Sequence, residues 1–428
     1  MYKEIFKEIH HIMQHDYAGW METKNLVKAA DVLQELQELN ESGELNDQTF
    51  SHVINKYLLN YQDKHVYFIT DNEYTFSPTY CGFSVIRHEN SLFVTATYEE
   101  TNLQVGTEII EIDGKSIEQN AKENANFLRD EIIERQQWGI VLNKASSLTI
   151  KKADGNTEQF LVSKHEYTTE QVNELKVLEN DIIYFKLSRF EYSEQLEVLI
   201  NEVMELAKQH SKLILDLRDN GGGNAGLLNP LIPYFFSSSE KPSINIPNRL
   251  FNCTENNVDA FIQFIEEMRP QITDQDTIDM LNFAVEEFNR NKGKGFISLD
   301  FTKLLQSRAD SFKGNDYLSA IVILTNSKTA SASEENVGLC KQSSKVTIIG
   351  QATCGINDYS DLVYRKWEEG KFVLNYPISK VEDFTAIHPI HGKGIHPDLY
   401  VPFSVENLQK DAELEIACQY LSGKVVVR

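Results

Sequence analysis

The chain lacks long hydrophobic runs, paired cysteines and a leader-like N-terminus. No run approaches the roughly 18 apolar residues that cross a bilayer, and the first residues, MYKEIFKEIHHIMQHDY, are polar and charged, unlike an apolar signal core. The cysteines are odd in number and scattered without a CxxC pair, which argues against a disulfide framework or a zinc site: Cys81, Cys253, Cys340, Cys354 and Cys418. We therefore expect a cytoplasmic protein with reduced thiols.

Basic residues are also scarce, because 41 Lys+Arg stand against 64 Asp+Glu and leave a formal net charge of −23. Such a chain repels phosphate backbones and anionic lipid, so we expect neither nucleic acid nor a membrane as a partner. Hydrophobic residues at 41% are enough to build real cores. The length of 428 residues favours two or three domains.

Three regions differ in their patterns. Residues 1–75 predict a helical region that ends in a strand over 66–69, next to His65. Residues 76–168 predict a β-rich domain with a hairpin turn at Asp113-Gly114 and one helix over about 117–135.

Residues 169–428 predict an α/β core, because buried apolar strands alternate with helices and favour a largely parallel sheet. The expected strands span 182–187, 212–217, 320–325 and 346–350. Within this core, residues of about 240–315 show helical spacing and many charges, which we interpret as an insertion.

The first candidate site is the glycine run that follows an apolar strand in LILDLRDNGGG, residues 213–223. Glycine lets backbone N–H groups approach a ligand closely, and such groups bind phosphate or a developing oxyanion. The phosphate-binding patterns GxxxxGK[ST] and GxGxxG are absent here. A merely flexible loop remains the structural alternative.

The second candidate is Ser331, which precedes a predicted helix directly after another apolar strand. A serine there meets free N–H groups and the positive end of the helix dipole, which suits a nucleophile with Ala332 N–H as an oxyanion donor. The alternative is an N-cap serine with Glu334 three residues on, a capping box, which spacing alone favours.

Histidines supply the third candidate, and His65 stands on a turn that enters a strand. A lone histidine at such a place is usually structural. His388, His391 and His396 crowd one loop but lack a matching carboxylate, so no metal is expected.

Together these segments resemble the carboxy-terminal processing (tail-specific) serine peptidases, with features of the tricorn-core and retinoid-binding-protein-like branches. The stretches that carry the resemblance are residues 215–223 (D-L-R-x-N-x-G-G), 328–334 (S-A-S-E), 350–355 (G-x-x-T-x-G), 394–398 (G-[IV]-x-P-D), 106–114 (G-D-x-I-x-x-I-(D/N)-G) and 63–66 (D-G-H-[TS]). They extend over nearly the whole chain outside residues 240–315.

The resemblance implies a crotonase-like (ClpP/crotonase) α/β peptidase core and a PDZ-like domain that captures peptide C-termini through Gly82 and Phe83 by β-augmentation. It also implies Ser331 as nucleophile, with an oxyanion hole formed by backbone N–H groups of Gly222, Gly223 and Ala332. No cofactor is implied. The expected partner is a peptide or unfolded protein substrate, and oligomerisation stays open.

The sequence departs from the family pattern at the base. The lysine of the T-x-G-K branch is replaced by Ile356, which cannot accept a proton. His65 fits the histidine of the other branch, but its glutamate position is occupied by His391, with Glu382 and Asp383 nearby as further candidates for a third partner.

The favoured hypothesis is a serine endopeptidase of extended or unfolded polypeptides in which His65 is the base for Ser331. The alternative is a catalytically impaired relative that binds peptides. Ile356 and His391 favour this alternative. Acyl-thioester chemistry on the same core is a weaker third reading, because it leaves the serine motif and the PDZ-like module without a role.

Overall fold

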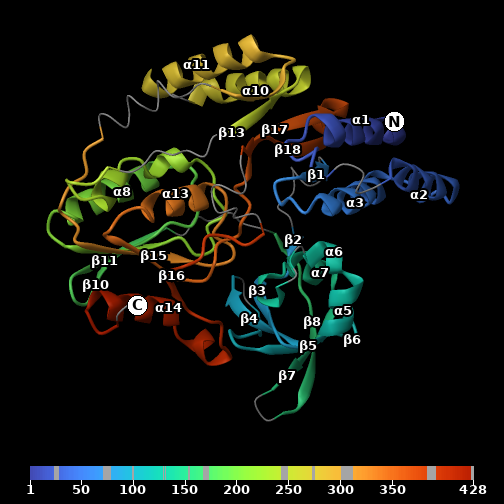
Figure 1. The fold of residues 1–428 in the computed structure, drawn as a ribbon. Helices are drawn as coiled ribbons and strands as arrows, with labels where there is room; N and C mark the ends of the chain where they lie inside the picture. The colour runs from blue at the N-terminus through green and yellow to red at the C-terminus, as the bar shows by residue number, and fades with distance from the viewer. Residues whose placement is uncertain are drawn as a thin grey trace.

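The computed structural model describes most of the chain (Figure 1). The described ranges are 1–23, 28–70, 79–98, 101–128, 130, 132–152, 155–166, 173–241, 249–271, 275–299, 312–382 and 392–425. Within these ranges, no helix combines the length and the apolar character that crossing a bilayer requires. The fold is a mixed α/β fold built on several sheets.

The first sheet is largely parallel, as the strand–helix alternation predicts. Its order is β10-β11-β12-β15-β16-β19. The strands are β10 (Glu174–Leu178), β11 (Ile182–Lys186), β12 (Lys212–Asp216), β15 (Ala320–Thr325), β16 (Val346–Gly350) and β19 (Leu399–Tyr400). All neighbours from β11 to β19 run parallel, and β10 joins β11 antiparallel.

Helices cover both faces of this sheet, which explains why its strands are apolar without alternation. One face packs against α8 (Glu194–Leu206) and α13 (Ala332–Cys340), with η3 (Ala225–Leu228) and α9 (Ile232–Phe235). The other face packs against α14 (Ala412–Leu421), which follows η6 (Val405–Gln409). Figure 1 shows α8 and α13 on one side of the strands and α14 on the other.

A second, antiparallel sheet lies beside the first and has the order β1-β18-β13-β14, with β17 also paired to β18. Its strands are β1 (Tyr67–Thr70), β13 (Arg249–Cys253), β14 (Gly295–Ser298), β17 (Tyr359–Trp367) and β18 (Phe372–Val381), and η5 (Glu368–Gly370) joins the last two. Every residue of β18 is buried.

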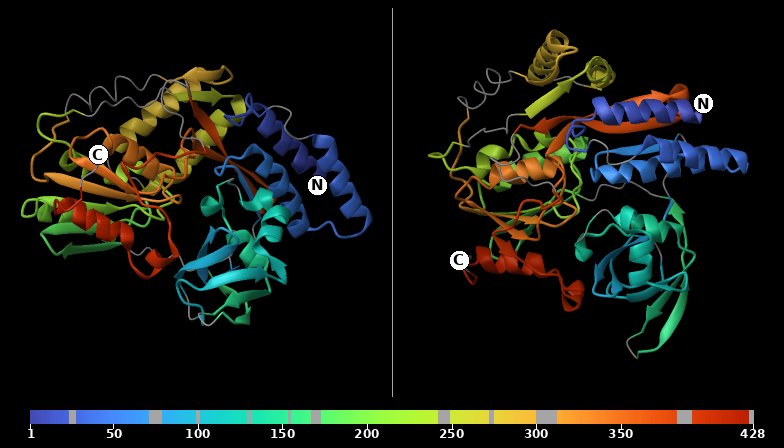
Figure 2. Two further views of the ribbon diagram at one scale, coloured as in Figure 1. Left: turned by 60° about the horizontal axis from the view of Figure 1, so that its bottom comes forward. Right: turned by 45° about the vertical axis from the view of Figure 1, so that its right-hand side comes forward.

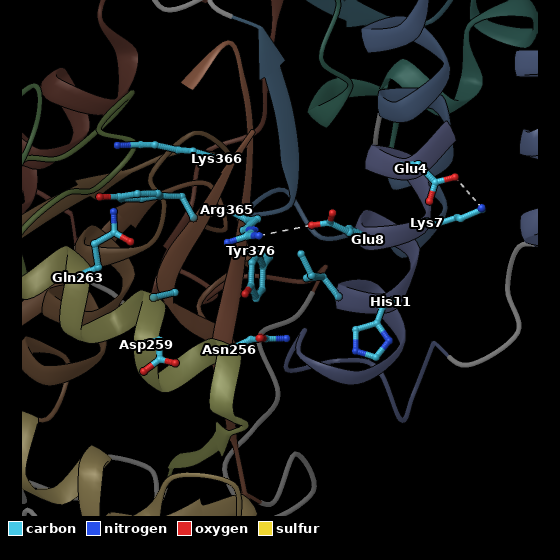
Figure 3. Close-up of a pocket in the computed structure, with 13 residues that line it drawn as sticks. Glu4, Lys7, Glu8, His11, Asn256, Asp259, Gln263, Arg365, Lys366 and Tyr376 are labelled. Atoms are coloured by element: carbon cyan, nitrogen blue, oxygen red, sulfur yellow. Dashed lines mark hydrogen bonds and ion pairs between the residues drawn. The ribbon is translucent and has the colours of Figure 1, made fainter. Parts of the chain in front are cut away.

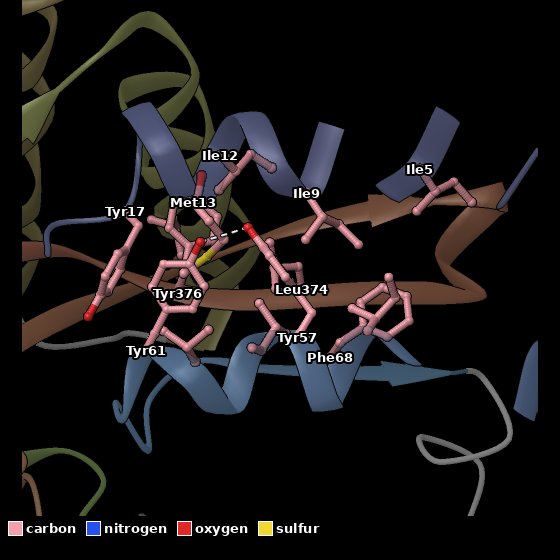
Figure 4. Close-up of a cluster of buried hydrophobic side chains, with 14 of the residues drawn as sticks. Ile5, Ile9, Ile12, Met13, Tyr17, Tyr57, Tyr61, Phe68, Leu374 and Tyr376 are labelled. Atoms are coloured by element: carbon pink, nitrogen blue, oxygen red, sulfur yellow. Dashed lines mark hydrogen bonds between the residues drawn. The ribbon is translucent and has the colours of Figure 1, made fainter. Parts of the chain in front are cut away.

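The N-terminal helices pack onto this second sheet. They are α1 (Tyr2–His15), α2 (Ala29–Glu41) and α3 (Asp47–Leu58), followed by η1 (Leu59–Tyr61). Figure 4 shows α1 and α3 beside the strands, with Ile9, Tyr57 and Leu374 among the side chains of this core. The two helices contact each other directly, because His10 Nδ1 lies 2.9 Å from the Tyr57 hydroxyl. Segments from the start, the middle and the end of the chain therefore share one core.

The predicted insertion is part of this arrangement. Besides the expected helices, α10 (Glu255–Met268) and α11 (Gln275–Asn291), with η4 (Arg269–Gln271), it contains β13 and β14 at its two ends. The helical spacing conceals these strands because each is only four or five residues long. Their stability comes from pairing with each other and from the pairing of β13 with β18, which local sequence does not reveal.

The β-rich module consists of β3 (Phe83–His88), β4 (Ser91–Thr97), β5 (Glu108–Ile112), β6 (Lys115–Ser116), β7 (Ser147–Lys151) and β8 (Thr157–Leu161), with β2 (Thr79–Tyr80) paired to β9 (His165–Glu166). The predicted hairpin turn is confirmed, because β5 pairs antiparallel with β6 and both Asp113 and Gly114 have positive φ.

The single helix predicted over 117–135 is wrong. The structure divides it into α5 (Ile117–Glu123), α6 (Ala125–Leu128) and η2 (Ile133–Arg135), and α7 (Gly139–Lys144) follows. The amide of Asn124 turns back to the carbonyl of Asn120, which ends the first helix locally. The two views of Figure 2 show this module next to the N-terminal helices.

Candidate active site

The two sequence motifs meet at one edge of the parallel sheet. β12 and β15 are parallel neighbours, so the loops after them leave the sheet at the same end. Hydrogen bonds join these loops directly: Ala330 N–H donates to Asn220 O at 2.9 Å, and Thr329 Oγ1 donates to Leu217 O at 2.8 Å. The glycine run and Ser331 are thereby fixed side by side.

Ser331 is the N-cap residue of α13 and forms a capping box with Glu334, so the structural interpretation of this serine holds. Its backbone is strained, with φ at +52°, a value that non-glycine residues rarely adopt and that costs about 1–3 kcal/mol. A strained turn before a helix presents the serine hydroxyl to the outside of the turn. The Oγ of Ser331 lies 3.4 Å from His65 Nε2.

Glu334 is buried below this serine, and its carboxylate accepts four hydrogen bonds. Oε1 accepts from Thr353 Oγ1 and Gly355 N–H, each at 2.6 Å, and Oε2 accepts from Ser331 N–H at 3.2 Å and Ile356 N–H at 3.0 Å. Burial raises the pKa of Glu334, and these hydrogen bonds act in the opposite direction. One carboxylate thus ties the serine to the loop that follows β16.

That loop occupies the place where the family resemblance expects a lysine. Ile356 contributes its backbone N–H to Glu334, and an isoleucine side chain has no group that can take a proton. The loop is held from outside by Gly394, where a Cβ would lie 1.9 Å from Thr353 O, and by Ile395 N–H, which donates to Thr353 Oγ1 at 2.7 Å. The closing motif therefore supports the serine turn indirectly.

His65 reaches Ser331 from the other layer of the fold. It lies in the turn between η1 and β1, where Asp63 Oδ1 accepts its backbone N–H at 2.8 Å. The side chain is 7% exposed. Burial lowers the pKa of His65, while the charge of Asp63 raises it in part, so the ring is neutral near pH 7. A neutral imidazole can accept the serine proton.

The other ring nitrogen of His65 lacks a hydrogen bond within the described part of the chain. The carboxylate nearest to it in an ion-pair contact is that of Asp63, whose Oδ1 lies 3.7 Å from Nδ1. Asp63 itself is buried, and its second oxygen accepts the Tyr17 hydroxyl at 3.0 Å.

The glycine run approaches the serine closely. A Cβ on Gly222 would lie 2.8 Å from Ser331 Cβ, and one on Gly223 would lie 2.1 Å from Phe190 O. Both have positive φ, at +101° and +133°. Only glycine fits these two positions without rearrangement.

The three expected oxyanion donors differ in availability. The Gly222 N–H is engaged, because it donates to Asn220 Oδ1 at 2.9 Å. Across the described ranges, the N–H groups of Gly223 and Ala332 have no hydrogen-bond partner. The backbone therefore leaves two donors, not three, for a ligand beside Ser331.

The candidates for a third partner are not brought to His65 by the described residues. Glu382 follows β18 with an exposed side chain, whereas His65 is buried. Asp383 and His391 lie outside the described residues. No three His, Cys, Asp or Glu side chains in the described ranges lie together as a metal-ion site would require.

Gly82 and Phe83 lie in the β-rich module. Gly82, with φ at +79°, links β2 to β3, and its carbonyl accepts Tyr98 N–H at 2.9 Å. Phe83 begins β3 with a buried side chain. β3 is at one end of the strand order β3-β4-β5-β7-β8, so one of its edges has no strand partner among the described residues.

Sequence reasoning missed the residues that support the site from a distance. Arg135 of the β-rich module donates to Cys354 O at 2.7 Å and to Lys393 O at 3.1 Å, and Asp130 pairs with it at 3.0 Å. The module thereby touches the loop that holds Glu334. Nothing in the sequence around Arg135 indicates such a contact, because it is one charged residue in a charged stretch. The spacing of Glu334 did predict the capping box with Ser331, but not the contacts of Glu334 with the loop after β16.

A groove of about 570 Å³ lies elsewhere, between α1, α10 and β17 (Figure 3). Some of its charged side chains pair with each other, for example Lys7 with Glu4 at 2.7 Å and Arg365 with Glu8 at 3.5 Å, whereas Lys366 pairs with Glu267 outside the groove. None of the lining residues belongs to the serine site, so the groove and the candidate active site are separate.

Comparisons with known proteins give one family and one set of structures. The model of peptidase family S41 matches residues 181–401, about half of the chain. The structure of mature CPAF complexed with lactacystin is similar with a TM-score of 0.64 at 12% identity, over 99% of this chain and 99% of that chain.

Two further structures are similar. Mature CPAF has a TM-score of 0.63 at 12% identity, over 100% of this chain and 98% of that chain. The photosystem II D1 C-terminal processing protease has a TM-score of 0.47 at 15% identity, over 95% of this chain and 96% of that chain. No curated protein matches. At these identities, the similarity to the two CPAF structures supports the fold alone.

Proposed function

The chain belongs to peptidase family S41 and is thereby a serine-type peptidase, and from this premise we propose that it cleaves extended or unfolded polypeptides internally with Ser331 as nucleophile and His65 as base. The observation that carries the proposal is the 3.4 Å separation of Ser331 Oγ and His65 Nε2, beside two backbone donors that have no partner among the described residues. Hydrogen bonds of this kind shorten when substrate binds, so a donor–acceptor distance slightly above 3.2 Å is compatible with a catalytic site without substrate.

The reaction follows from these positions. His65 Nε2 takes the proton from Ser331 Oγ as the oxygen attacks the scissile carbonyl, and it later gives that proton to the leaving amine. The N–H groups of Gly223 and Ala332 hold the developing oxyanion. Each such donor contributes about 3–4 kcal/mol to the stability of the transition state at other serine sites.

Substrate capture is proposed for the β-rich module, which we interpret as PDZ-like, while the parallel core is interpreted as crotonase-like. A peptide C-terminal segment would add to the edge of β3 that has no strand partner among the described residues, and would place its end near Gly82 and Phe83. The main support is the strand order, because an edge strand with an unpaired side can accept another strand. Only an extended segment can reach a serine turn that lies between two layers of the fold.

Ser331→Ala tests the catalytic proposal. We expect hydrolysis of an unfolded protein such as casein to fall to background and labelling by a fluorophosphonate probe to disappear. Ser327→Ala is the matched control in the same loop, because the Ser327 side chain makes no hydrogen bond within the described ranges. Undiminished hydrolysis by Ser331→Ala would refute the assignment.

A second candidate is a peptide-binding protein that has lost turnover. It is favoured by Ile356 at the place of the family lysine and by Nδ1 of His65, for which the described residues provide no hydrogen bond. It predicts that the unaltered protein is not labelled by the probe, and that peptide binding measured by calorimetry is equal in Ser331→Ala.

A further inference from the structure

A buried carboxylate faces the ring nitrogen of His65 that does not face the serine. Asp63 Oδ1 lies 3.7 Å from Nδ1, while Nε2 on the opposite side of the ring lies 3.4 Å from Ser331 Oγ. The Asp63 side chain is 1% exposed, and Nδ1 has no hydrogen bond in the described part of the chain. Burying a polar ring nitrogen and a carboxylate is costly for each alone, and an interaction between the two offsets part of this cost.

Asp63 is held in a defined orientation. Its Oδ1 accepts the His65 backbone N–H at 2.8 Å, its backbone carbonyl accepts Val66 N–H at 3.1 Å, and its Oδ2 accepts the Tyr17 hydroxyl at 3.0 Å. Burial and the neighbouring Asp63 raise the pKa of Tyr17 well above its usual value, so this hydroxyl remains a donor. Tyr17 is fixed in turn through the next residue, because Ala18 N–H donates to Pro377 O at 2.9 Å.

Other charges act on the His65 ring from the second sheet. Arg249 at the start of β13 lowers the pKa of His65, whereas a hydrogen bond with the backbone of Tyr359 and the charge of Asp361, both in β17, raise it. Asp361 accepts the Ser379 hydroxyl, which occupies one of its oxygens. Among the described carboxylates, Asp63 alone makes an ion-pair contact with the ring.

We propose that Asp63 is the positioning residue of the site: its ionised carboxylate binds the Nδ1–H of His65 and keeps Nε2 directed at Ser331. This inference rests on the proposed function and replaces the third partner that the sequence places in the closing segment. The present 3.7 Å exceeds the usual limit of about 3.2 Å for a hydrogen bond. A small rotation of the ring closes it when substrate binds.

The proton balance is that of a serine–histidine–carboxylate site. Ser331 Oγ gives its proton to Nε2, Nδ1 keeps its own, and Asp63 stays ionised beside the imidazolium. The proton on Nε2 then leaves with the amine. Asp63 thus never touches the substrate and acts only through the ring.

Asp63→Asn is the first test. The asparagine keeps the size of the side chain and an oxygen for the His65 N–H, but it loses the charge. We expect kcat to fall between about 10²- and 10⁴-fold and the acid limb of the kcat/KM profile to move lower by about one pH unit or more, because an anion that favoured the imidazolium has gone. A purely structural role would lower the melting temperature and leave that limb in place.

Asp361→Asn is the matched control, because it removes a charge near the ring without removing a contact to Nδ1. We expect the acid limb to move less and the plateau kcat to stay within about twofold. The proposal is overturned if Asp63→Asn keeps the plateau kcat, or if Glu382→Gln or Asp383→Asn loses as much activity as we expect from Asp63→Asn.

A second measurement separates this inference from the proposed function and from misfolding. In protein labelled with ¹⁵N at histidine, the ring resonances of His65 report which nitrogen carries the proton, with or without turnover. We expect the Nδ1–H form above the pKa in Ser331→Ala. A predominant Nε2–H form refutes the role of Asp63. If Nδ1–H predominates but the unaltered protein does not hydrolyse casein, only the proposed peptidase activity is refuted.

Discussion

Glu334 offers the sharpest test of how the serine turn is held. Its two oxygens accept hydrogen bonds from four donors, namely Ser331 N–H, Thr353 Oγ1, Gly355 N–H and Ile356 N–H. Glu334→Gln keeps the shape of the side chain but replaces one of the two accepting oxygens by a donating NH₂ group. No orientation of glutamine satisfies all four donors.

The magnitude follows from the better of the two orientations. With the NH₂ at the position of Oε1, the hydroxyl of Thr353 can turn to accept, but Gly355 N–H faces another donor and stays unpaired. One buried orphan donor costs about 1–3 kcal/mol, and the two bonds that remain lose their charged acceptor, which weakens each by roughly half. Burying a charged carboxylate is unfavourable, so the neutral glutamine offsets part of this loss of stability. We expect the free energy of unfolding to fall by about 2–4 kcal/mol.

Urea denaturation with an unchanged m-value measures this effect. Glu335→Gln is the matched control, because Glu335 is the next residue of α13, is exposed and makes no side-chain hydrogen bond within the described ranges. The control should stay within about 0.5 kcal/mol of the unaltered protein. If Glu334→Gln also stays within that margin, the carboxylate does not hold the loop and the argument fails.

Two further predictions concern the backbone and the base. In Gly223→Ala the new Cβ would lie 2.1 Å from Phe190 O at a φ of +133°, so we expect the free energy of unfolding in urea to fall by at least about 2 kcal/mol. Gly221→Ala is the control and should leave this free energy unchanged, because nothing lies within 4 Å of its Cβ. Equal stabilities of the two variants would contradict the close approach at Gly223. Burial lowers the pKa of His65 below its ordinary 6.5, and the neutral ring is the proposed base, so kcat/KM should stay high down to pH 6.5 and decline only below it. Stability should also fall as the pH is lowered, because His65 takes up its proton at a higher pH in the unfolded chain than in the folded one. An acid limb above pH 6.5 would refute this cause.

Much of the parallel core could be predicted from the sequence, because strands buried on both faces are continuous apolar runs. The strands around 182–187, 212–217, 320–325 and 346–350 were predictable on that ground, and the loops after two of them contain Gly223 and Ser331. The meeting of these loops follows from parallel neighbours alone. For His65 the residues alone gave no reason to expect a partner, and only the family resemblance connected it to Ser331.

The assembly of the second sheet was beyond prediction, although the strand over 66–69 was expected, because the pairing of β1 with β18 joins segments about 300 residues apart. β1 is four residues long and finds its partner in β18, and β13 and β14 are as short. Asp63 belongs to the stretch 63–66 that carries the family resemblance, but its contact with His65 was overlooked for a related reason. Only the hydrogen bond from Tyr17 and the position of the His65 ring distinguish this carboxylate in the structure.

The pairing of β1 with β18 also dictates when the site can exist. While the chain is being synthesised, β1 has no β18 partner until Asn375 has emerged, and Gly394 must follow before it can contact the Thr353 loop from outside. The serine turn and the histidine therefore cannot be fixed side by side before both segments have been synthesised. A nascent chain that ends before them carries Ser331 and His65 without the contacts that hold the two residues together.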